Sequence, residues 1–163
     1  MHPIVDLQIE YSLISRGIED AFLPACRELG IGITAYGVLS RGLISGHWQQ
    51  ASGPQDFRSH SPRFQGENLD HNLHLVEALR AVAAKRGATV ALIAIGWVLA
   101  QGGDIVPVIG ARRRERLAES LGAVALKLSS EDLKEIERAA PKGSAKAIAM
   151  PVSQMPMLDS ERR

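Results

Sequence analysis

Four arginines lie within five positions directly after a short apolar segment: Arg112, Arg113, Arg114 and Arg116. Their spacing predicts the beginning of a helix, where the backbone dipole already carries positive charge and further cations cost free energy. An anion in front of that helix would offset the cost, because exposed N–H groups and guanidinium groups both bind phosphate. Gly110 would let the backbone approach such a ligand. The alternative is a solvated basic helix whose arginines pair with Glu115 and Glu119.

A second segment with binding potential begins at Tyr36 and also follows a short apolar run. A tyrosine at the end of a strand can stack on a flat heteroaromatic ligand. Gly37 and Gly42 allow close backbone approach, and Arg41 can neutralise a phosphate. Barrel enzymes often bind phosphate with the loops after their last two strands, which favours a shared site, although a tyrosine beside a glycine-rich turn is also common in simple packing.

Other side chains that could do chemistry have plainer interpretations. His71 and His74 are three positions apart on a predicted helix, but no third ligand accompanies them, so no metal site is predicted. Cys26 lies on the apolar side of a helix and is expected to be an inert core thiol. Trp97 lies in an apolar helix and is expected in the core.

Apolar periodicity indicates the elements that must position these residues. It predicts strands over residues 4–9, 31–36 and 104–109, and helices over 18–29, 68–85, 90–100, 113–122 and from Ser129 or Ser130 to 140. Pro24 should kink the first helix or lie in an early turn, and Gly30 is a plausible C-cap. Thr89 can cap the helix over 90–100. In the polar stretch 37–70, Trp48 and Phe64 either cover a barrel mouth or hold the loop in place.

This alternation is typical of an α/β fold built around a parallel sheet. Three strands are too few to close a barrel, and a parallel sheet needs cover on both faces, so part of a larger structure is expected. The first and third strands would each have an open edge. Self-association, association with a complementary fragment, or poor solubility is therefore expected.

Composition excludes several classes of function. The formal net charge of +1 argues against a nucleic-acid partner, and the single cysteine excludes an internal disulfide framework. The longest apolar run, residues 88–100, is shorter than the ~18 residues expected of a membrane span. The first residues do not resemble a secretory signal. We therefore expect a cytoplasmic protein of about one domain, with no membrane partner.

Several motifs in this order resemble those of the aldo-keto reductases. They are QIEYSL at 8–13, PACRELG at 24–30, AYGVLSRG at 35–42, PRFQGEN at 62–68, GWVLA at 96–100, VPVIG at 106–110 with Arg116, Leu117 and Glu119, and QMPMLDSE at 154–161. The resemblance implies a TIM-type (β/α)8 barrel that reduces an aldehyde or ketone by hydride transfer from NADPH. Residues 1–140 would be the C-terminal part of that barrel, with about its last three strands, and 141–163 a tail.

The resemblance also assigns roles within the cofactor site. Gln8 would bind the nicotinamide amide and Tyr36 would stack on the ring. Twelve positions are implicated in all: Gln8, Tyr36, Gly37, Leu39, Arg41, Gly42, Gly110, Ala111, Arg112, Arg116, Glu119 and Ser120. Leu39, Arg41, Gly42, Gly110, Ala111 and Arg112 would line the pyrophosphate. Arg116 would meet the 2′-phosphate, and Glu119 and Ser120 the adenine.

Two of these positions depart from the family pattern. Gly37 stands where the family commonly has serine, and Ser120 where it has asparagine. The family's catalytic Asp, Tyr, Lys and His would precede Met1, so no catalytic residue is assigned, and Tyr11 does not correspond to the catalytic tyrosine. The leading hypothesis is a truncated NADPH-dependent reductase. The alternatives are a non-catalytic module that binds NADPH or a partner, and a truncated gene product that folds poorly.

Overall fold

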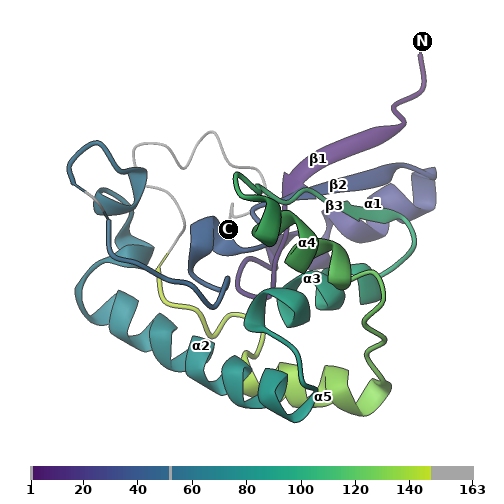
Figure 1. The fold of residues 1–163 in the computed structure, drawn as a ribbon. Coiled ribbons are helices and arrows are strands. Elements are labelled where there is room, and N and C mark those ends of the chain that lie inside the picture. The colour runs from purple at the N-terminus through teal and green to yellow at the C-terminus, as the bar shows by residue number, and fades with distance from the viewer. Residues whose placement is uncertain (1, 52, 148–163) are drawn as a thin grey trace.

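A computed structural model describes residues 2–51 and 53–147 of the chain. Its three strands are β1 (Asp6–Glu10), β2 (Gly32–Tyr36) and β3 (Ile105–Pro107), and they form a parallel sheet in the order β1-β2-β3 (Figure 1). The register places Asp6 opposite Gly32 and Ala35 opposite Pro107. This confirms the α/β class and the expectation of part of a barrel.

The strands are shorter than the apolar runs that predicted them. Ladder pairing of β1 begins only at Asp6, so Ile4 and Val5 extend beyond the strand and are exposed. β3 ends at Pro107, and beyond it the Val108 N–H still donates to the Ala35 carbonyl at 2.8 Å. The difference arises because pairing partners, and not apolar character alone, set the length of a strand.

The connection from β1 to β2 contains a 3-10 turn, η1 (Gly17–Asp20), and the helix α1 (Phe22–Leu29). The sequence predicted one continuous helix over 18–29, but Ala21 has φ −137° and separates the two. Pro24 lies in the first turn of α1, where its missing N–H is not needed. Gly30 ends the helix in the left-handed conformation at φ +67°, which confirms the predicted C-cap.

The connection from β2 to β3 is long, and aromatic side chains pack against each other in its loop. Three short 3-10 turns, η2 (Ser40–Gly42), η3 (Phe57–Ser59) and η4 (Pro62–Phe64), precede the helices α2 (Gly66–Lys85) and α3 (Val90–Ala100). Trp48 and Phe64 stack on each other with ring centroids 5.4 Å apart, and Phe64 is buried. Of the two roles considered for this pair, the contacts favour holding the loop in place. The Thr89 hydroxyl caps α3 by accepting a hydrogen bond from the Leu92 N–H.

Up to residue 147, where the described part of the chain ends, two helices follow β3, namely α4 (Arg114–Gly122) and α5 (Ser130–Ala139). Arg113 has extended backbone, so α4 begins one residue later than the sequence predicted. Of the two residues that the sequence offered as the N-cap of α5, Ser129 and Ser130, the structure has Ser129 in that position. Its hydroxyl accepts from the Asp132 N–H, while the Asp132 carboxylate accepts from the Ser129 N–H at 2.7 Å. This reciprocal capping box fixes the start of α5.

The Asp132 carboxylate makes the stability of α5 depend on pH. Hydrogen bonds from Ser129, aided by the nearby Arg86 cation, hold the pKa of Asp132 below its usual range. A lowered folded pKa means that the stabilisation is complete above the unfolded pKa and is lost as pH falls through the folded value. We expect Asp132→Asn to lower the free energy of unfolding at pH 7 by about 0.5–2 kcal/mol, and by less in acid.

Urea unfolding followed by circular dichroism at pH 7 and at pH 3 measures this difference. Glu131→Gln is the matched control, since Glu131 also lies in the first turn of α5 but does not join the capping box. An equal loss of stability in both variants, or a loss from Asp132→Asn that does not change with pH, would contradict the assignment.

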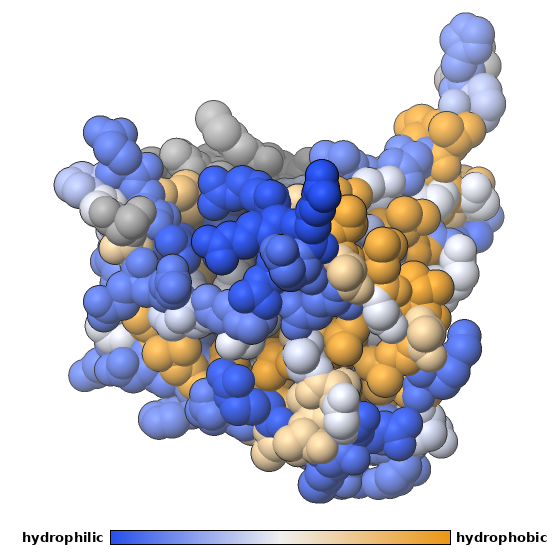
Figure 2. Space-filling model, viewed as in Figure 1, coloured by the Kyte–Doolittle hydropathy of each residue, from blue (hydrophilic) through white to orange (hydrophobic). Residues whose placement is uncertain are grey.

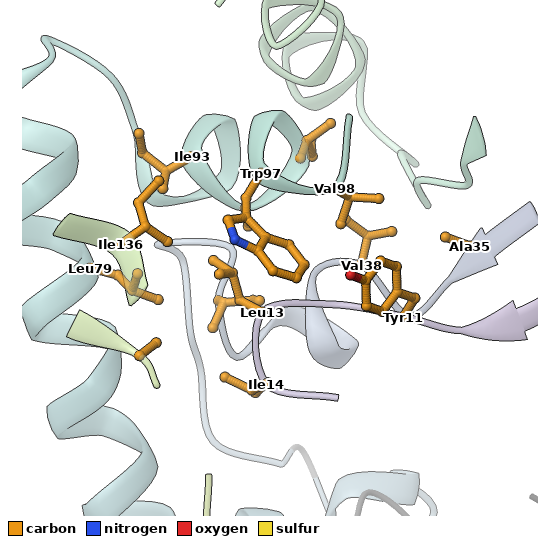
Figure 3. Close-up of a cluster of buried hydrophobic side chains, with 14 of the residues drawn as sticks. Tyr11, Leu13, Ile14, Ala35, Val38, Leu79, Ile93, Trp97, Val98 and Ile136 are labelled. Carbon is orange, nitrogen blue, oxygen red and sulfur yellow. The ribbon is translucent and has the colours of Figure 1, made fainter. Parts of the chain in front are cut away.

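The core lies between the helices and the chain that follows β1 (Figure 3). Trp97 of α3 is 2% exposed, and its ring lies 5.4 Å from that of the fully buried Tyr11. Burial of Trp97 and Cys26 confirms both as core residues. Helices α2 and α5 lie side by side and close the far side of this core (Figure 1).

The helices pack against one face of the sheet, and the other face is more exposed. Side chains that alternate along the strands on one face are buried or half-buried against the helices: Leu7, Ile9, Ile33, Ala35 and Ile105. On the other face Gln8 is exposed, Thr34 is half-buried and Val106 is 61% exposed. No described helix covers this second face.

None of the described helices is by itself long and apolar enough to cross a bilayer. Helices α2 and α3 taken together have the necessary length and composition, but they are bent by 86° at the break between them.

Candidate functional site

A pocket of about 540 Å³ opens at the carboxyl ends of β2 and β3. Small-molecule sites commonly have volumes of about 300–1,000 Å³. Ten of the twelve residues implicated by the sequence line it: Tyr36, Gly37, Leu39, Arg41, Gly42, Gly110, Arg112, Arg116, Glu119 and Ser120. In Figure 2 the most hydrophilic side chains gather over the start of α4, beside this pocket. The structure therefore joins the two segments that each had binding potential.

Two implicated residues do not line the pocket. Gln8 is exposed on the uncovered face of the sheet, on the same side of the strands as Tyr36 by alternation and register. Ala111 is half-buried beside the pocket residues Gly110 and Arg112. Gln8 thus lies where a ligand extending from the pocket across the bare face would pass.

The loop after β2 has unusual backbone geometry. Gly37 and Gly42 have φ angles of +69° and +96°, and Ser40 and Arg41 between them have φ angles of +45° and +53°. Left-handed backbone costs a non-glycine residue about 1–3 kcal/mol and is concentrated at ligand clamps and active sites. The strain at Ser40 and Arg41 is therefore consistent with a loop shaped for a ligand.

The geometry at Gly37 explains its departure from the family's serine. A Cβ added there would lie 3.0 Å from Cγ of Glu10, in addition to the unfavourable φ. Glu10 is buried at the end of β1 and lines the pocket. Glycine at position 37 therefore makes room for the Glu10 side chain.

Glu10 belongs to a buried polar group beneath the pocket. The Ser15 hydroxyl donates to Glu10 Oε1 at 3.0 Å, and Arg63 Nη1 donates to the Ser15 hydroxyl at 2.8 Å and lies 3.9 Å from the same carboxylate oxygen. All three side chains are buried. Sequence reasoning missed this group, although Glu10 lies in the QIEYSL motif, because Arg63 comes from a distant segment.

The arginine cluster is only partly neutralised. Arg112, Arg113 and Arg116 line the pocket, and α4 begins at Arg114 with no side-chain cap on its first N–H groups. Among the described residues, Arg112, Arg113 and Arg114 form no ion pair, whereas Arg116 pairs with Glu119 at 3.0 Å. The alternative of internal pairing thus holds for one of the four arginines. The other three leave uncompensated positive charge beside a helix N-terminus.

Arg116 lies in a small network of charged and polar side chains. Burial raises the pKa of Glu119, but hydrogen bonds from Thr89 and Arg116 and the nearby His47 hold it below its usual range. The His47 ring contacts Arg116 through Nε2 and lies 3.6 Å from the Glu119 carboxylate. His47 also lines the pocket and was missed from the sequence, because 69 residues separate it from Arg116.

Two further side chains that the sequence raised, Arg41 and His71, have contacts of their own within the fold. The Arg41 guanidinium lies over the Phe57 ring, 4.3 Å from its centroid, at the rim of the pocket. His71 contacts the Ser144 carbonyl at 2.9 Å through Nε2. Within the described ranges, no three His, Cys, Asp or Glu side chains are arranged to hold a metal ion.

Comparison with known proteins identifies the family. The model of the aldo/keto reductase family matches residues 1–141, which is most of the chain. The chain belongs to the aldo/keto reductase family. Its relatives include probable aldo-keto reductase 1 from Glycine max, which is 46% identical over 145 residues, or 88% of this chain and 42% of the relative.

Solved structures of aldo-keto reductases have the same fold. A glycerol dehydrogenase from Gluconobacter oxydans superposes with a TM-score of 0.78 at 29% identity, over 93% of this chain and 45% of the dehydrogenase. A thermostable aldo-keto reductase in complex with the inhibitor epalrestat gives a TM-score of 0.62 at 28% identity, over 85% and 41% of the two chains. The chain therefore spans less than half the length of these aldo-keto reductases.

The boundary placed at residue 140 stays a prediction. The family match ends at residue 141, and the described residues end at residue 147. The QMPMLDSE motif at 154–161 lies outside the described residues.

Proposed function

We propose that the pocket binds NADPH and that the complete aldo-keto reductase reduces an aldehyde or ketone to an alcohol. The observation that carries this proposal is the convergence of two strand-end loops on one pocket, with four arginines and a helix N-terminus at its rim. Such a rim suits phosphate groups, because the helix N–H groups and guanidinium groups both stabilise anions.

The residues present fit the parts of a dinucleotide in order. Tyr36 would stack on the nicotinamide ring, and Gln8 on the same side of the sheet would bind its amide. The left-handed loop at Arg41 and Gly42 would face Gly110 and Arg112 across the pyrophosphate. Arg116 would bind the 2′-phosphate at the far end, with Glu119 and Ser120 beside the adenine. Preference for NADPH over NADH would then reside in Arg116.

Reduction requires groups beyond those of the pocket. When NADPH is bound, its nicotinamide supplies a hydride to the carbonyl carbon, and the carbonyl oxygen takes a proton from an acid, so that an alcohol forms. The family resemblance assigns this acid to a tyrosine whose pKa a lysine lowers. The described pocket lining contains Tyr36, which is assigned to stacking, and contains no lysine. We therefore propose that this chain supplies the cofactor site of the enzyme.

The corresponding test measures binding and turnover on the same preparation. Quenching of tryptophan fluorescence by NADPH is expected to saturate, while absorbance at 340 nm shows no oxidation of NADPH with 4-nitrobenzaldehyde or methylglyoxal. Turnover by this chain would contradict the proposal that it supplies the cofactor site without the catalytic groups. Saturable binding that persists without turnover after completion of the barrel would favour the non-catalytic binding module instead.

A further inference from the structure

His47 is a titratable side chain of the pocket to which the proposed function gives no role. The Ser45 hydroxyl accepts a hydrogen bond from the His47 N–H at 3.1 Å and donates one to the Gly42 carbonyl at 2.7 Å. This turn holds the imidazole against α4, where its Nε2 contacts Arg116 and lies 3.6 Å from the Glu119 carboxylate. His47 therefore faces one cation and one anion, and both belong to the end of the pocket assigned to the 2′-phosphate.

The contact with Arg116 fixes the charge of His47 in the free chain. A guanidinium group can only donate hydrogen bonds, so the imidazole nitrogen that it contacts must accept one and carries no proton. His47 is thus neutral while Arg116 occupies this position. Arg116 also donates to the Glu119 carboxylate at 3.0 Å, so that one guanidinium group serves both neighbours.

A phosphate group bound by Arg116 would reverse this arrangement. It would draw the guanidinium away from Glu119 and would bring up to two negative charges of its own. The Glu119 carboxylate would keep its hydrogen bond from Thr89 but would lose its cation. The imidazole of His47, 3.6 Å away, can replace that cation only when it is protonated.

The other charges around the pocket act in the same direction. The remaining titratable side chains of its lining are Glu10, Tyr36, Arg41, Arg112 and Arg113. Three of these are cations, and in the free chain they oppose a positive charge on His47. Glu10 is buried in the polar group beneath the pocket. The phosphate groups of a bound dinucleotide would offset the three cations and so favour protonation of His47.

We infer that His47 takes up a proton when NADPH binds and replaces Arg116 as the partner of Glu119, which makes His47 a specificity-determining residue for the 2′-phosphate. The inference rests on the proposed function, because it concerns the same pocket. NADH lacks this phosphate and leaves Arg116 on Glu119, so it binds without proton uptake. The affinity for NADPH is then highest in mild acid and falls as pH rises through the range in which histidines titrate.

Isothermal titration calorimetry in buffers of different ionisation enthalpy measures the protons exchanged on binding. At pH 7 we expect the unmodified chain to take up protons with NADPH and to take up none with NADH. The 2′-phosphate itself titrates at about pH 6 and can only lose a proton beside arginines. Net uptake of protons therefore identifies a group of the protein.

His47→Gln keeps a polar side chain at this position but removes the titratable group. The variant is expected to bind NADPH without proton uptake. Relative to it, the affinity of the unmodified chain for NADPH should fall about tenfold between pH 6 and pH 8. His74→Gln is the matched control, since His74 is exposed on α2 and does not line the pocket, and it should behave as the unmodified chain does.

The outcomes separate this inference from the proposed function. Saturable binding of NADPH without proton uptake, or equal uptake in the unmodified chain and in His47→Gln, would overturn the role of His47 and leave the cofactor site standing. Absence of NADPH binding to the unmodified chain would overturn both.

Discussion

Replacing Arg116 with alanine is expected to weaken NADPH binding about 5- to 150-fold, which corresponds to about 1–3 kcal/mol for a charged hydrogen-bonded contact. NADH lacks the 2′-phosphate, so its affinity should change little. Arg116 pairs with Glu119 in the free chain, and the phosphate must therefore compete with that carboxylate. The measured loss is the difference between these two interactions. Fluorescence titration with each cofactor gives both dissociation constants.

Arg114→Ala is the matched control for this experiment. Arg114 begins α4 and is exposed, but it does not line the pocket. Its removal lowers the charge by the same amount, so a general electrostatic effect would appear in both variants. An equal loss for NADPH and NADH in Arg116→Ala would remove the assignment of the 2′-phosphate to this residue.

Replacing Trp97 with alanine is expected to lower the free energy of unfolding by about 3–5 kcal/mol, the usual cost of truncating a large buried aromatic. Trp97 is 2% exposed, contacts Tyr11, and lies beneath the Arg16 guanidinium at 5.0 Å. Single domains are stable by only about 5–15 kcal/mol, so the variant should be largely unfolded in modest urea.

Trp48→Ala provides the comparison with the same change in a different environment. Trp48 is half-buried in the loop after β2, where it stacks on Phe64. Its removal should loosen that loop and cost less than the removal of Trp97. Urea unfolding followed by far-UV circular dichroism measures both. A loss of less than 1 kcal/mol in Trp97→Ala would show that this side chain does not support the core.

The sequence predicted the elements whose ends are marked by local chemistry. Thr89 caps a helix that ends where its apolar run ends, and Gly30 stops α1 through a left-handed conformation. The predicted start of β1 and both predicted ends of β3 lay outside the observed strands, because strand length depends on a partner that apolar character does not reveal. The predicted first helix is divided at Ala21, and alanine is not a residue type from which a helix break would be predicted.

In the candidate site, too, the sequence predicted the residues whose role follows from their neighbours in the chain, and missed those whose partners are distant in the chain. Helix position and charge pointed to the arginines. The tyrosine, glycines and arginine that follow an apolar run pointed to the loop after β2, and the family motifs agreed with this. His47 and Arg63 were missed because each acts on a partner far along the chain, Arg116 and Ser15 respectively. Only their proximity to these partners in space marks His47 and Arg63 as part of the site. The sequence does not reveal that proximity, because residues 37–70 have no regular periodicity from which to predict their structure.

Titration of the unmodified chain with NADPH, with NADH as the comparison, tests the central claim most directly. Saturable quenching with tighter binding of NADPH than of NADH is the predicted result. Absence of saturation with NADPH would show that the arginine-rimmed pocket is not a cofactor site.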